Sequence, residues 1–315
     1  MGMLVEQFFQ ALSAGILLGC IYGLMCVGLA LIFGIMGVIN FAQADLMMVG
    51  MYLALLTVVT FLADTFLGLA APFLAAFMIG PVLFLLGGAL HKVLISRTTG
   101  ATIANPAEAH QAQLILTLGI ALILQNGALI ILGSAPRSVI SPLSSEAWQI
   151  PLLYDDFSAV FINKARAYNA ALCVAISIVI FWLIRATRVG KSLRAAADNP
   201  TASLYMGIDV DRVHRLAFAG GTAIAGIAGG LLVLYYPVQP FVGGDFLIIM
   251  YAGVVLGGMG SIVGAFWGGF AIAIVQQLST LVLPLQLQNA TIFVAFLLLL
   301  ILRPQGFFGR NTERA

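Results

Sequence analysis

Long runs of apolar residues without a single Asp, Glu, Lys or Arg alternate with short polar segments along most of this chain. A helix needs roughly 20 apolar residues to cross a bilayer core of about 30 Å. Each run is long enough, or nearly long enough, for one crossing, and the first and last are long enough for more. The runs cover residues 7–44, 46–63, 65–90, 111–136, 167–184, 216–244 and 246–302. The pattern predicts an all-α, polytopic transmembrane helical bundle.

Composition excludes the main alternatives to this fold class. Hydrophobic residues make up 62% of the chain and charged residues 8%, whereas soluble domains contain about 45–50% and about 25%. So few charges cannot cover a soluble surface of this size. A membrane β-barrel would show short segments that alternate apolar and polar residues, but the apolar runs here are continuous.

The distribution of charge predicts the orientation in the membrane. All but three of the 14 Lys and Arg residues, the exceptions being Arg137, Lys164 and Arg166, fall in clusters that the positive-inside rule assigns to the cytoplasm. Placing 91–111, 186–215 and 303–315 inside requires an even number of crossings between them. This favours about nine helices, with a range of eight to ten, a start outside and a C-terminus in the cytoplasm. The acidic residues assigned to outer loops are Glu6, Asp64, Glu146, Asp155, Asp156 and Asp245.

We expect residues 1–315 to form a single integral-membrane domain. Its largest polar segments are a cytoplasmic loop at about 186–215 and an outer loop at about 134–168. The outer loop is rich in Pro and aromatic residues, so it either docks an external partner or forms an interfacial connector with an aromatic belt. The 34 glycines suit close helix packing. Phe33–Gly37 and Leu256–Gly260 are similar, which indicates either an internal repeat or chance similarity of Gly-rich stretches.

Motifs of enzymatic chemistry are absent from the sequence. There is no GxxxxGK[ST] phosphate loop, no HExxH and no GxSxG nucleophile elbow. We therefore expect no catalytic activity, no metal or other cofactor bound by this chain, and no nucleic-acid partner. The histidines stand at predicted helix ends, where solvated side chains are usual, and the cysteines stand in apolar runs without metal-ligand or disulfide spacing. These residues are His91, His110, His214, Cys20, Cys26 and Cys173.

One polar cluster interrupts the apolar N-terminal region. Asn40, Gln43 and Asp45 lie within six residues and are flanked by glycines. An ionisable residue at membrane depth is costly, so it usually faces protein or water. The cluster is interpreted either as a broken helix that lines a substrate path or as a short loop at the membrane face.

A second cluster lies in the predicted cytoplasmic loop, between Arg188 and Asp209. Asn199 followed by Pro200 is typical of a helix N-cap and first helical residue, and Gly207 suits the position just past a helix end. The sequence predicts about two turns of helix between them, with Leu204 and Tyr205 free to dock. This helix either seats a peripheral cytoplasmic partner or rests on lipid headgroups.

Three separated motifs resemble the permease subunits of branched-chain amino acid ABC transporters, a likeness that covers nearly the whole chain. The first runs from Tyr22-Gly23-Leu24 to Asn40-Phe41-Ala42-Gln43-Ala44-Asp45, where the family often has His-Gly-Glu in place of the last three residues. The second, Arg194-Ala195-Ala196-Ala197-Asp198-Asn199-Pro200 with Met206-Gly207-Ile208, is similar to the loop that contacts the ATPase in that family. The third combines 257–265 with Arg303-Pro304-Gln305-Gly306-Phe307-Phe308-Gly309.

The resemblance implies a permease half of an ATP-driven importer in a bacterial inner membrane. It implies a homologous second permease, often as a heterodimer, two cytoplasmic ATPase subunits that hold ATP and Mg²⁺, and a periplasmic solute-binding protein. Asn40, Gln43 and Asp45 then line the substrate pathway. The implied ATPase-coupling residues are Arg194, Asp198, Asn199, Pro200, Leu204, Tyr205 and Gly207.

The resemblance implies branched-chain amino acids as the solutes, and a Gly-rich, largely apolar path suits an aliphatic side chain. Importers of urea or short amides belong to close relatives and remain an alternative. From another class, an ion-coupled secondary transporter or a channel needs no ATPase. Such a protein is expected to carry intramembrane charges, and Asp45 is the one residue that we identify as such from the sequence.

Overall fold

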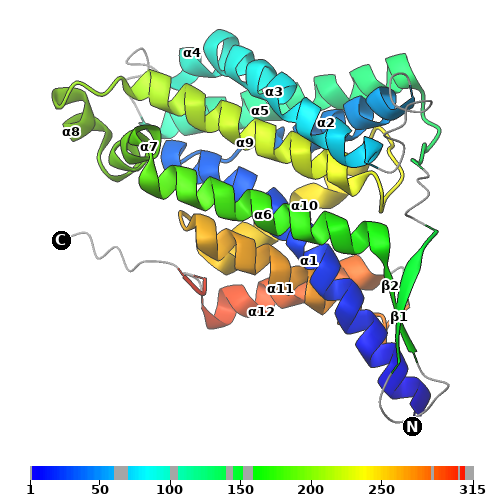
Figure 1. Ribbon diagram of the computed structural model, residues 1–315. Helices are drawn as coiled ribbons and strands as arrows, with labels where there is room; N and C mark the ends of the chain where they lie inside the picture. The colour runs from blue at the N-terminus through cyan, green and yellow to red at the C-terminus, as the bar shows by residue number, and fades with distance from the viewer. Residues whose placement is uncertain are drawn as a thin grey trace.

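The computed structural model describes residues 2–59, 70–99, 106–139, 145–151, 159–284, 287–303 and 306–308. Within these ranges most residues are helical (Figure 1). The longer helices are α1 (Gly2–Met36), α2 (Gln43–Thr57), α3 (Ala71–Leu90), α5 (Pro106–Leu132), α6 (Lys164–Ala186), α9 (Val210–Leu232), α10 (Val242–Gly257), α11 (Ile262–Ser279) and α12 (Gln288–Leu302). Shorter elements are the π-helix η2 (His91–Ile95), the helices α4 (Ser96–Thr99), α7 (Arg188–Asp198) and α8 (Pro200–Tyr205), and the strands β1 (Ala147–Pro151) and β2 (Ala159–Asn163).

The helical, polytopic character predicted from the apolar runs is confirmed. Six helical segments of the described chain are long and apolar enough to cross a membrane, and they contain α1, α3, α5, α6, α9 and α11. Three further apolar helices, α2, α10 and α12, have only 15 or 16 residues. The number of about nine crossings depends on these short helices, so it stays a prediction, as does the orientation.

Helices α1 and α9 form the centre of the bundle. Helix α1 packs against α6, α9, α10 and α11, while α9 also contacts α2 and α3. Large side chains of these two helices, such as Tyr22, Met25 and Phe218, are fully buried in the bundle. With 35 residues, α1 is about 52 Å long at 1.5 Å per residue, well beyond a hydrocarbon core of about 30 Å. Its first turns therefore extend past the other helices.

A β-hairpin occupies part of the predicted outer loop, so the fold is not purely helical. Strands β1 and β2 pair antiparallel, with Gln149 opposite Phe161. The outward edge of β2 is completed by Gln10 of α1, whose side-chain amide donates to the Phe161 carbonyl and accepts from the Phe161 N–H, both at 2.9 Å. The alternation of aromatic and β-branched residues in β2 favours a strand. An amide from a residue far away in sequence fixes its position.

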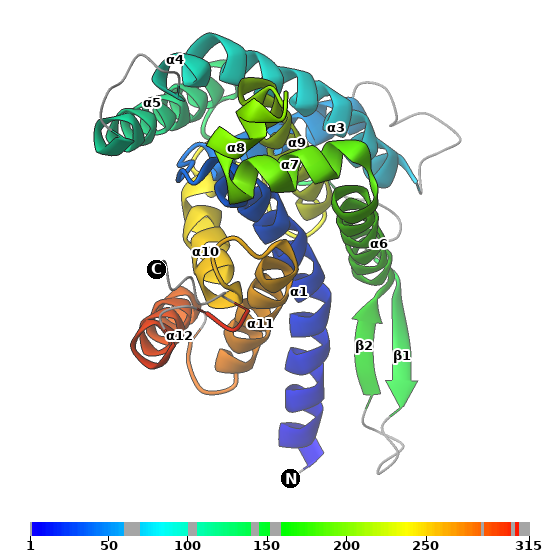
Figure 2. The same cartoon turned by 90° about the vertical axis from the view of Figure 1, so that its left-hand side faces the viewer.

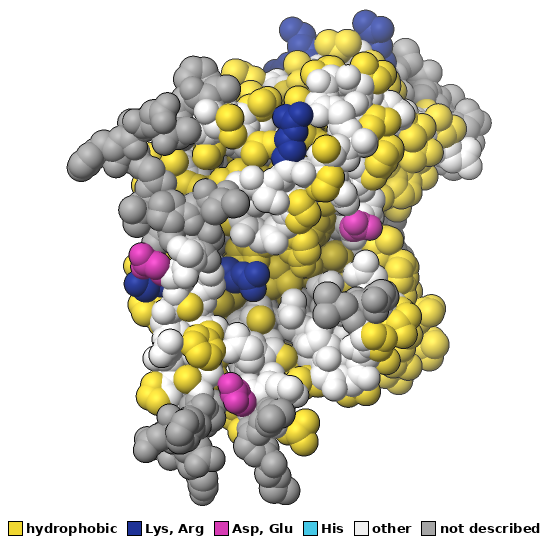
Figure 3. Space-filling model, turned by 90° about the vertical axis from the view of Figure 1, so that its right-hand side faces the viewer, with side chains coloured by type: hydrophobic (Ala, Val, Ile, Leu, Met, Phe, Trp, Pro, Cys, Tyr) yellow, Lys and Arg dark blue, Asp and Glu magenta, His cyan; other side chains and the backbone are white. Residues whose placement is uncertain are grey.

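The two ends of the bundle differ in charge. Helices α4, α7 and α8, the start of α9 and the end of α12 gather at one end, and the hairpin lies with the start of α1 at the other (Figures 1 and 2). Most described basic residues belong to the first end, as the positive-inside pattern predicts. Seen from the hairpin end, hydrophobic side chains cover much of the surface and charged ones are few (Figure 3). The arrangement supports a membrane-embedded bundle with one basic face.

The two similar Gly-rich stretches of the sequence lie against each other. A Cβ added to Gly34 would come within 3.5 Å of the Cα of Gly260. Gly37 follows the end of α1 with φ of 68°, and Gly258 and Gly260 follow the end of α10 with φ of 99° and 94°. Glycine adopts this left-handed backbone without steric cost. Each stretch therefore ends a helix, whether the two are similar because of an internal repeat or by chance.

Candidate functional site

Asn40 and Gln43 form a buried polar knot between α1 and α2. The Asn40 amide donates to the Gln43 side-chain oxygen at 3.1 Å, and the Asn40 side-chain oxygen accepts from the backbone N–H of Ala42 at 3.1 Å. Gln43 in turn donates to the backbone carbonyl of Gly221 in α9 at 3.0 Å. Both side chains are at most 2% exposed. Because each has hydrogen-bond partners, the knot holds the start of α2 against α9 without burying unpaired amide groups.

Asp45 lies in the first turn of α2 and is equally buried. Gln125 of α5 donates a hydrogen bond to one of its carboxylate oxygens at 2.9 Å. The same oxygen touches Gly243 in the first turn of α10, where a Cβ would collide with it. The first turns of two short helices therefore meet at this carboxylate, and the positive end of each helix dipole favours its charge.

The predicted pathway residues are thus brought together, but they face protein in this conformation. The described cavities reach only their neighbour Phe41. All three side chains are buried, so they are not exposed to water here as a loop in solvent would be, although Asn40 does lie in the non-helical segment between α1 and α2. Whether they contact solute stays a prediction.

On the prediction that Gln43 lines a substrate pathway, we expect Gln43→Cys to react with small polar thiol reagents only while solute passes. The reason is that position 43 is fully enclosed here, so reaction requires the knot to open. The three native cysteines are buried and contribute little background. Labelling of Gln43→Cys with and without ATP and solute measures the effect, and equal inertness under all conditions would contradict a place on the pathway.

An apolar cavity of about 210 Å³ lies beside this knot, between α10 and α12. Its walls are formed by apolar and aromatic residues, among them Phe41, Ile248, Tyr251, Ile292, Phe293 and Phe296. Pockets for drug-sized ligands usually measure about 300–1,000 Å³, so this one suits a smaller apolar group. The rings of Phe41 and Tyr251 pack 5.9 Å apart at its edge.

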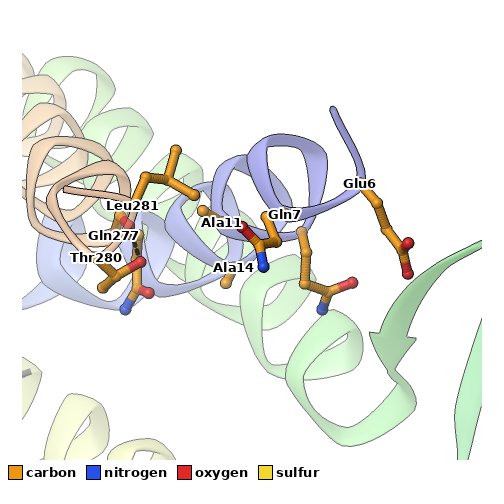
Figure 4. Close-up of a pocket in the computed structure, with 8 residues that line it drawn as sticks. Glu6, Gln7, Ala11, Ala14, Gln277, Thr280 and Leu281 are labelled. Atoms are coloured by element: carbon orange, nitrogen blue, oxygen red, sulfur yellow. Dashed lines mark hydrogen bonds between the residues drawn. The ribbon is translucent and has the colours of Figure 1, made fainter. Parts of the chain in front are cut away.

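A second, polar recess of about 510 Å³ opens at the hairpin end of the molecule. Figure 4 shows that Glu6, Gln7 and Ala11 come from the first turns of α1, and Gln277, Thr280 and Leu281 from the end of α11 and the residues after it. The recess is open to solvent, and its lining combines Glu, Gln and Thr side chains with Ala and Leu.

The predicted cytoplasmic helix exists with both of its predicted caps. The Asn199 side chain accepts from the N–H of Ala202 at 2.9 Å, and Pro200 is the first residue of α8. At the other end Gly207 has φ of 80°, and the N–H of Ile208 donates to the carbonyl of Ser203 at 2.9 Å. This is a Schellman motif. Six residues are therefore held as a rigid helix by local interactions.

Helix α8 presents an unpartnered apolar knob at the basic end. Leu204, Tyr205 and Met206 are 59%, 87% and 83% exposed. The preceding α7 instead buries Gly190, Leu193 and Ala196 against the bundle. Of the remaining predicted coupling residues, Arg194 donates to the carbonyl of Arg185 and Asp198 is exposed at the end of α7. The knob, defined as residues 204–206, is connected to the core of the bundle through α7.

His91 departs from the expectation of a solvated side chain. It is fully buried in η2, its ring lies 6.1 Å from that of Phe218, and neither ring nitrogen has a hydrogen-bond partner in the described structure. Helix α9 covers His91. The position of His91 next to a basic loop in the sequence does not reveal this contact. His110 is exposed as expected, whereas His214 is partly buried.

Asp245 is a polar residue whose location the sequence misassigned. It lies in the first turn of α10 and not in a loop. Like Asp45, it is a lone carboxylate that separates two long charge-free runs, and that isolation was the signal available in the sequence. The described residues contain no cluster of three or more His, Cys, Asp or Glu that could hold a metal ion.

Comparisons with known proteins identify the family. The model of the permease component of branched-chain amino acid transport systems matches residues 11–302. The permease LivH of the high-affinity branched-chain amino acid system of Escherichia coli is 30% identical over 96% of each chain. The corresponding permease BraD of Pseudomonas aeruginosa is 25% identical over 97% of each chain. A guanosine ABC transporter permease of Bacillus subtilis, NupQ, is 26% identical over 87% of this chain and 84% of its own. No solved structure matches the chain.

The match covers the knot, the short helices α2 and α10, and the knob of α8, and six long apolar helices agree with a multi-pass membrane protein. A permease subunit of this kind is not itself catalytic. The chain belongs to the family of permease components of branched-chain amino acid ABC transporters.

Proposed function

We propose that this chain is one permease of an ATP-driven importer that carries leucine, isoleucine and valine across a bacterial inner membrane. It pairs with a homologous second permease, two cytoplasmic ATPase subunits that hold ATP and Mg²⁺, and a periplasmic solute-binding protein. The observation that carries the proposal is the rigid, exposed knob of α8 at the basic end of the bundle. The sequence has no phosphate loop of its own, so a partner must supply the energy.

The geometry suggests how an ATPase drives the path. Closure of the ATPase pair pushes on residues 204–206, and α7 passes the movement to α1, α6 and α9, which it contacts. Helix α9 carries the Gly221 carbonyl that holds Gln43. A shift of α9 therefore loosens the knot at the start of α2. ATP and delivered solute stabilise different arrangements of these helices, and access alternates between the two sides.

The apolar cavity between α10 and α12 favours an aliphatic solute over urea. It holds about 210 Å³ and is lined by apolar and aromatic side chains, so a urea molecule would leave its polar groups without partners there. Short amides are disfavoured for the same reason. Because the chain is also similar to a guanosine permease, larger solutes such as guanosine should be tested alongside amino acids.

Reconstitution tests the proposal directly. We expect the complex isolated through a tag on this chain to concentrate labelled leucine in vesicles only with ATP and the binding protein, because the chain has no site for nucleotide. Labelled valine, urea, a short amide and guanosine form the comparison set. The chain alone serves as control and should concentrate nothing. Accumulation by the chain alone, driven by an ion gradient, would contradict the proposal and favour a secondary transporter.

A further inference from the structure

Asp245 lies at membrane depth. Asp45 contacts both Gly243 of α10 and Gln125 of α5, so the first turn of α10 is level with Gln125. Gln125 stands seven residues before Leu132, the end of α5, which places it about 10 Å inside that end at 1.5 Å per residue. The segment His110–Leu132 is one of the helices able to cross a membrane. Asp245, two residues beyond Gly243, is therefore level with the interior of a helix that is long and apolar enough to cross the membrane.

The side chain of Asp245 is nevertheless exposed on the outside of this bundle. No described residue forms an ion pair or hydrogen bond with it. A carboxylate at this depth is rarely left against lipid and normally faces water, a cation or another protein chain. The surface around Asp245 is therefore not a lipid-facing surface.

The apolar cavity lies further along α10, on the same face as Asp245. Ile248, one turn further on, is 40% exposed and lines the cavity with Tyr251. Residues three and four apart on a helix are neighbours on one face. This face, with α5 and α12 on either side, lies across the molecule from α6 (Figure 2). It therefore combines one carboxylate with one small apolar pocket about one helical turn away.

We propose that Asp245 binds the ammonium group of the transported amino acid, while its aliphatic side chain enters the cavity beside Ile248. The inference deepens the proposed function and rests on it, since it takes an amino acid as the solute. A charged amine and a branched alkyl group separated by one carbon match a carboxylate and an apolar pocket one turn apart. The α10 face then borders the path that this permease shares with its partner.

The first test compares charge variants in the reconstituted complex. Asp245→Asn is expected to lower the rate of leucine uptake at least tenfold, with complex assembly unchanged, and Asp245→Glu should recover part of the rate. Glu146→Gln is the matched control, because Glu146 is an exposed carboxylate in the outer segment, paired only with Lys164. It should transport as the unmodified complex does. Uptake by Asp245→Asn at the unmodified rate would overturn the inference.

The second test separates charge from shape. Asp245→Cys should react with charged thiol reagents, and excess leucine presented by the binding protein should slow the reaction. Modification with a sulfonate reagent restores a negative charge and should raise uptake several-fold, whereas a trimethylammonium reagent of similar size should not. Ile178→Cys is the lipid-side control, because α6 lies across the bundle from α10 (Figure 2) and Ile178 of α6 is 60% exposed, and it should stay inert.

Two outcomes would reject the role of Asp245. An inert thiol at position 245 would show that lipid covers this face. Loss of the second permease from the Asp245→Asn complex would assign the carboxylate to a contact between subunits. The reactivity at 245 is measured independently of uptake. A complex that takes up no leucine at all, yet reacts at 245, would contradict the proposed substrate and not the exposure of this face to water.

Discussion

Replacing Tyr205 with alanine is expected to abolish most ATP-driven uptake while leaving the helical bundle folded. The ring is 87% exposed, so its removal takes few contacts from this chain, and surface changes of this kind usually alter stability by less than about 0.5 kcal/mol. An aromatic anchor at a protein interface, in contrast, commonly contributes at least 2 kcal/mol, or about 30-fold in affinity. Co-purification of the ATPase and uptake measure the loss of coupling, and thermal unfolding checks that the bundle stays folded.

Tyr168→Ala provides the matched control for this prediction. Tyr168 is 47% exposed, lies in the first turns of α6 at the hairpin end, and packs against Trp148. Its loss should leave ATPase binding unchanged. Two changes that disturb the seat of α8 without removing the ring, Gly207→Trp and Asp198→Arg, should also uncouple uptake. Gly207 has φ of 80°, which costs other residues about 1–2 kcal/mol. Full ATPase binding and uptake in Tyr205→Ala, Gly207→Trp and Asp198→Arg would contradict the assignment of residues 204–206 as the ATPase contact.

Local chemistry explains why the α8 region could be predicted from sequence. The Asn199 cap, the first-turn Pro200 and the left-handed Gly207 each act on backbone groups within five residues, so their effect does not depend on the rest of the fold. The charge-free runs are similarly local, because the bilayer sets the length of every crossing. Both kinds of prediction are confirmed by the elements of the structure.

Tertiary contacts account for what the sequence did not reveal. Gln43 is anchored by a carbonyl 178 residues away, and Asp45 by an amide 80 residues away. Nothing near either residue in sequence identifies these partners. His91 was expected in solvent because the sequence cannot show that α9 covers it. The hairpin was missed because its outer edge is completed by Gln10 of α1.

Asp245 bears on the competing class of function. From sequence, Asp45 was the one intramembrane carboxylate identified, and in the structure Asp245 follows two residues after Gly243, which Asp45 contacts. Intramembrane carboxylates are typical of ion-coupled transporters. Family membership favours the ATP-driven mechanism instead. On the proposed function, Asp245 then binds solute and neither carboxylate is needed for proton or sodium coupling.

Gly50→Ala is expected to destabilise the bundle by about 2 kcal/mol, within the usual range for overpacking of a core. Gly50 of α2 faces Gly226 of α9, and an added Cβ would lie 2.6 Å from the Gly226 carbonyl oxygen and 2.7 Å from its Cα. Backbone atoms cannot rotate away as a side chain does, so α2 and α9 must separate. The gain in helix propensity from Gly to Ala, at most about 1 kcal/mol, does not offset this.

Gly88→Ala is the control that isolates the clash from the propensity gain. Gly88 also lies on a helix that packs against α9, but its added Cβ would meet only the Cβ of Ala219, at the ordinary contact distance of 3.8 Å. We expect Gly50→Ala to lower the melting temperature in detergent by about 5 °C and Gly88→Ala to leave it unchanged or slightly raised. The separation of α2 from α9 should also weaken the Gln43 hydrogen bond to Gly221 and with it leucine uptake. Equal melting temperatures for the two variants would mean that α2 and α9 do not approach through their glycines, and that the knot at Gln43 is held by some other contact.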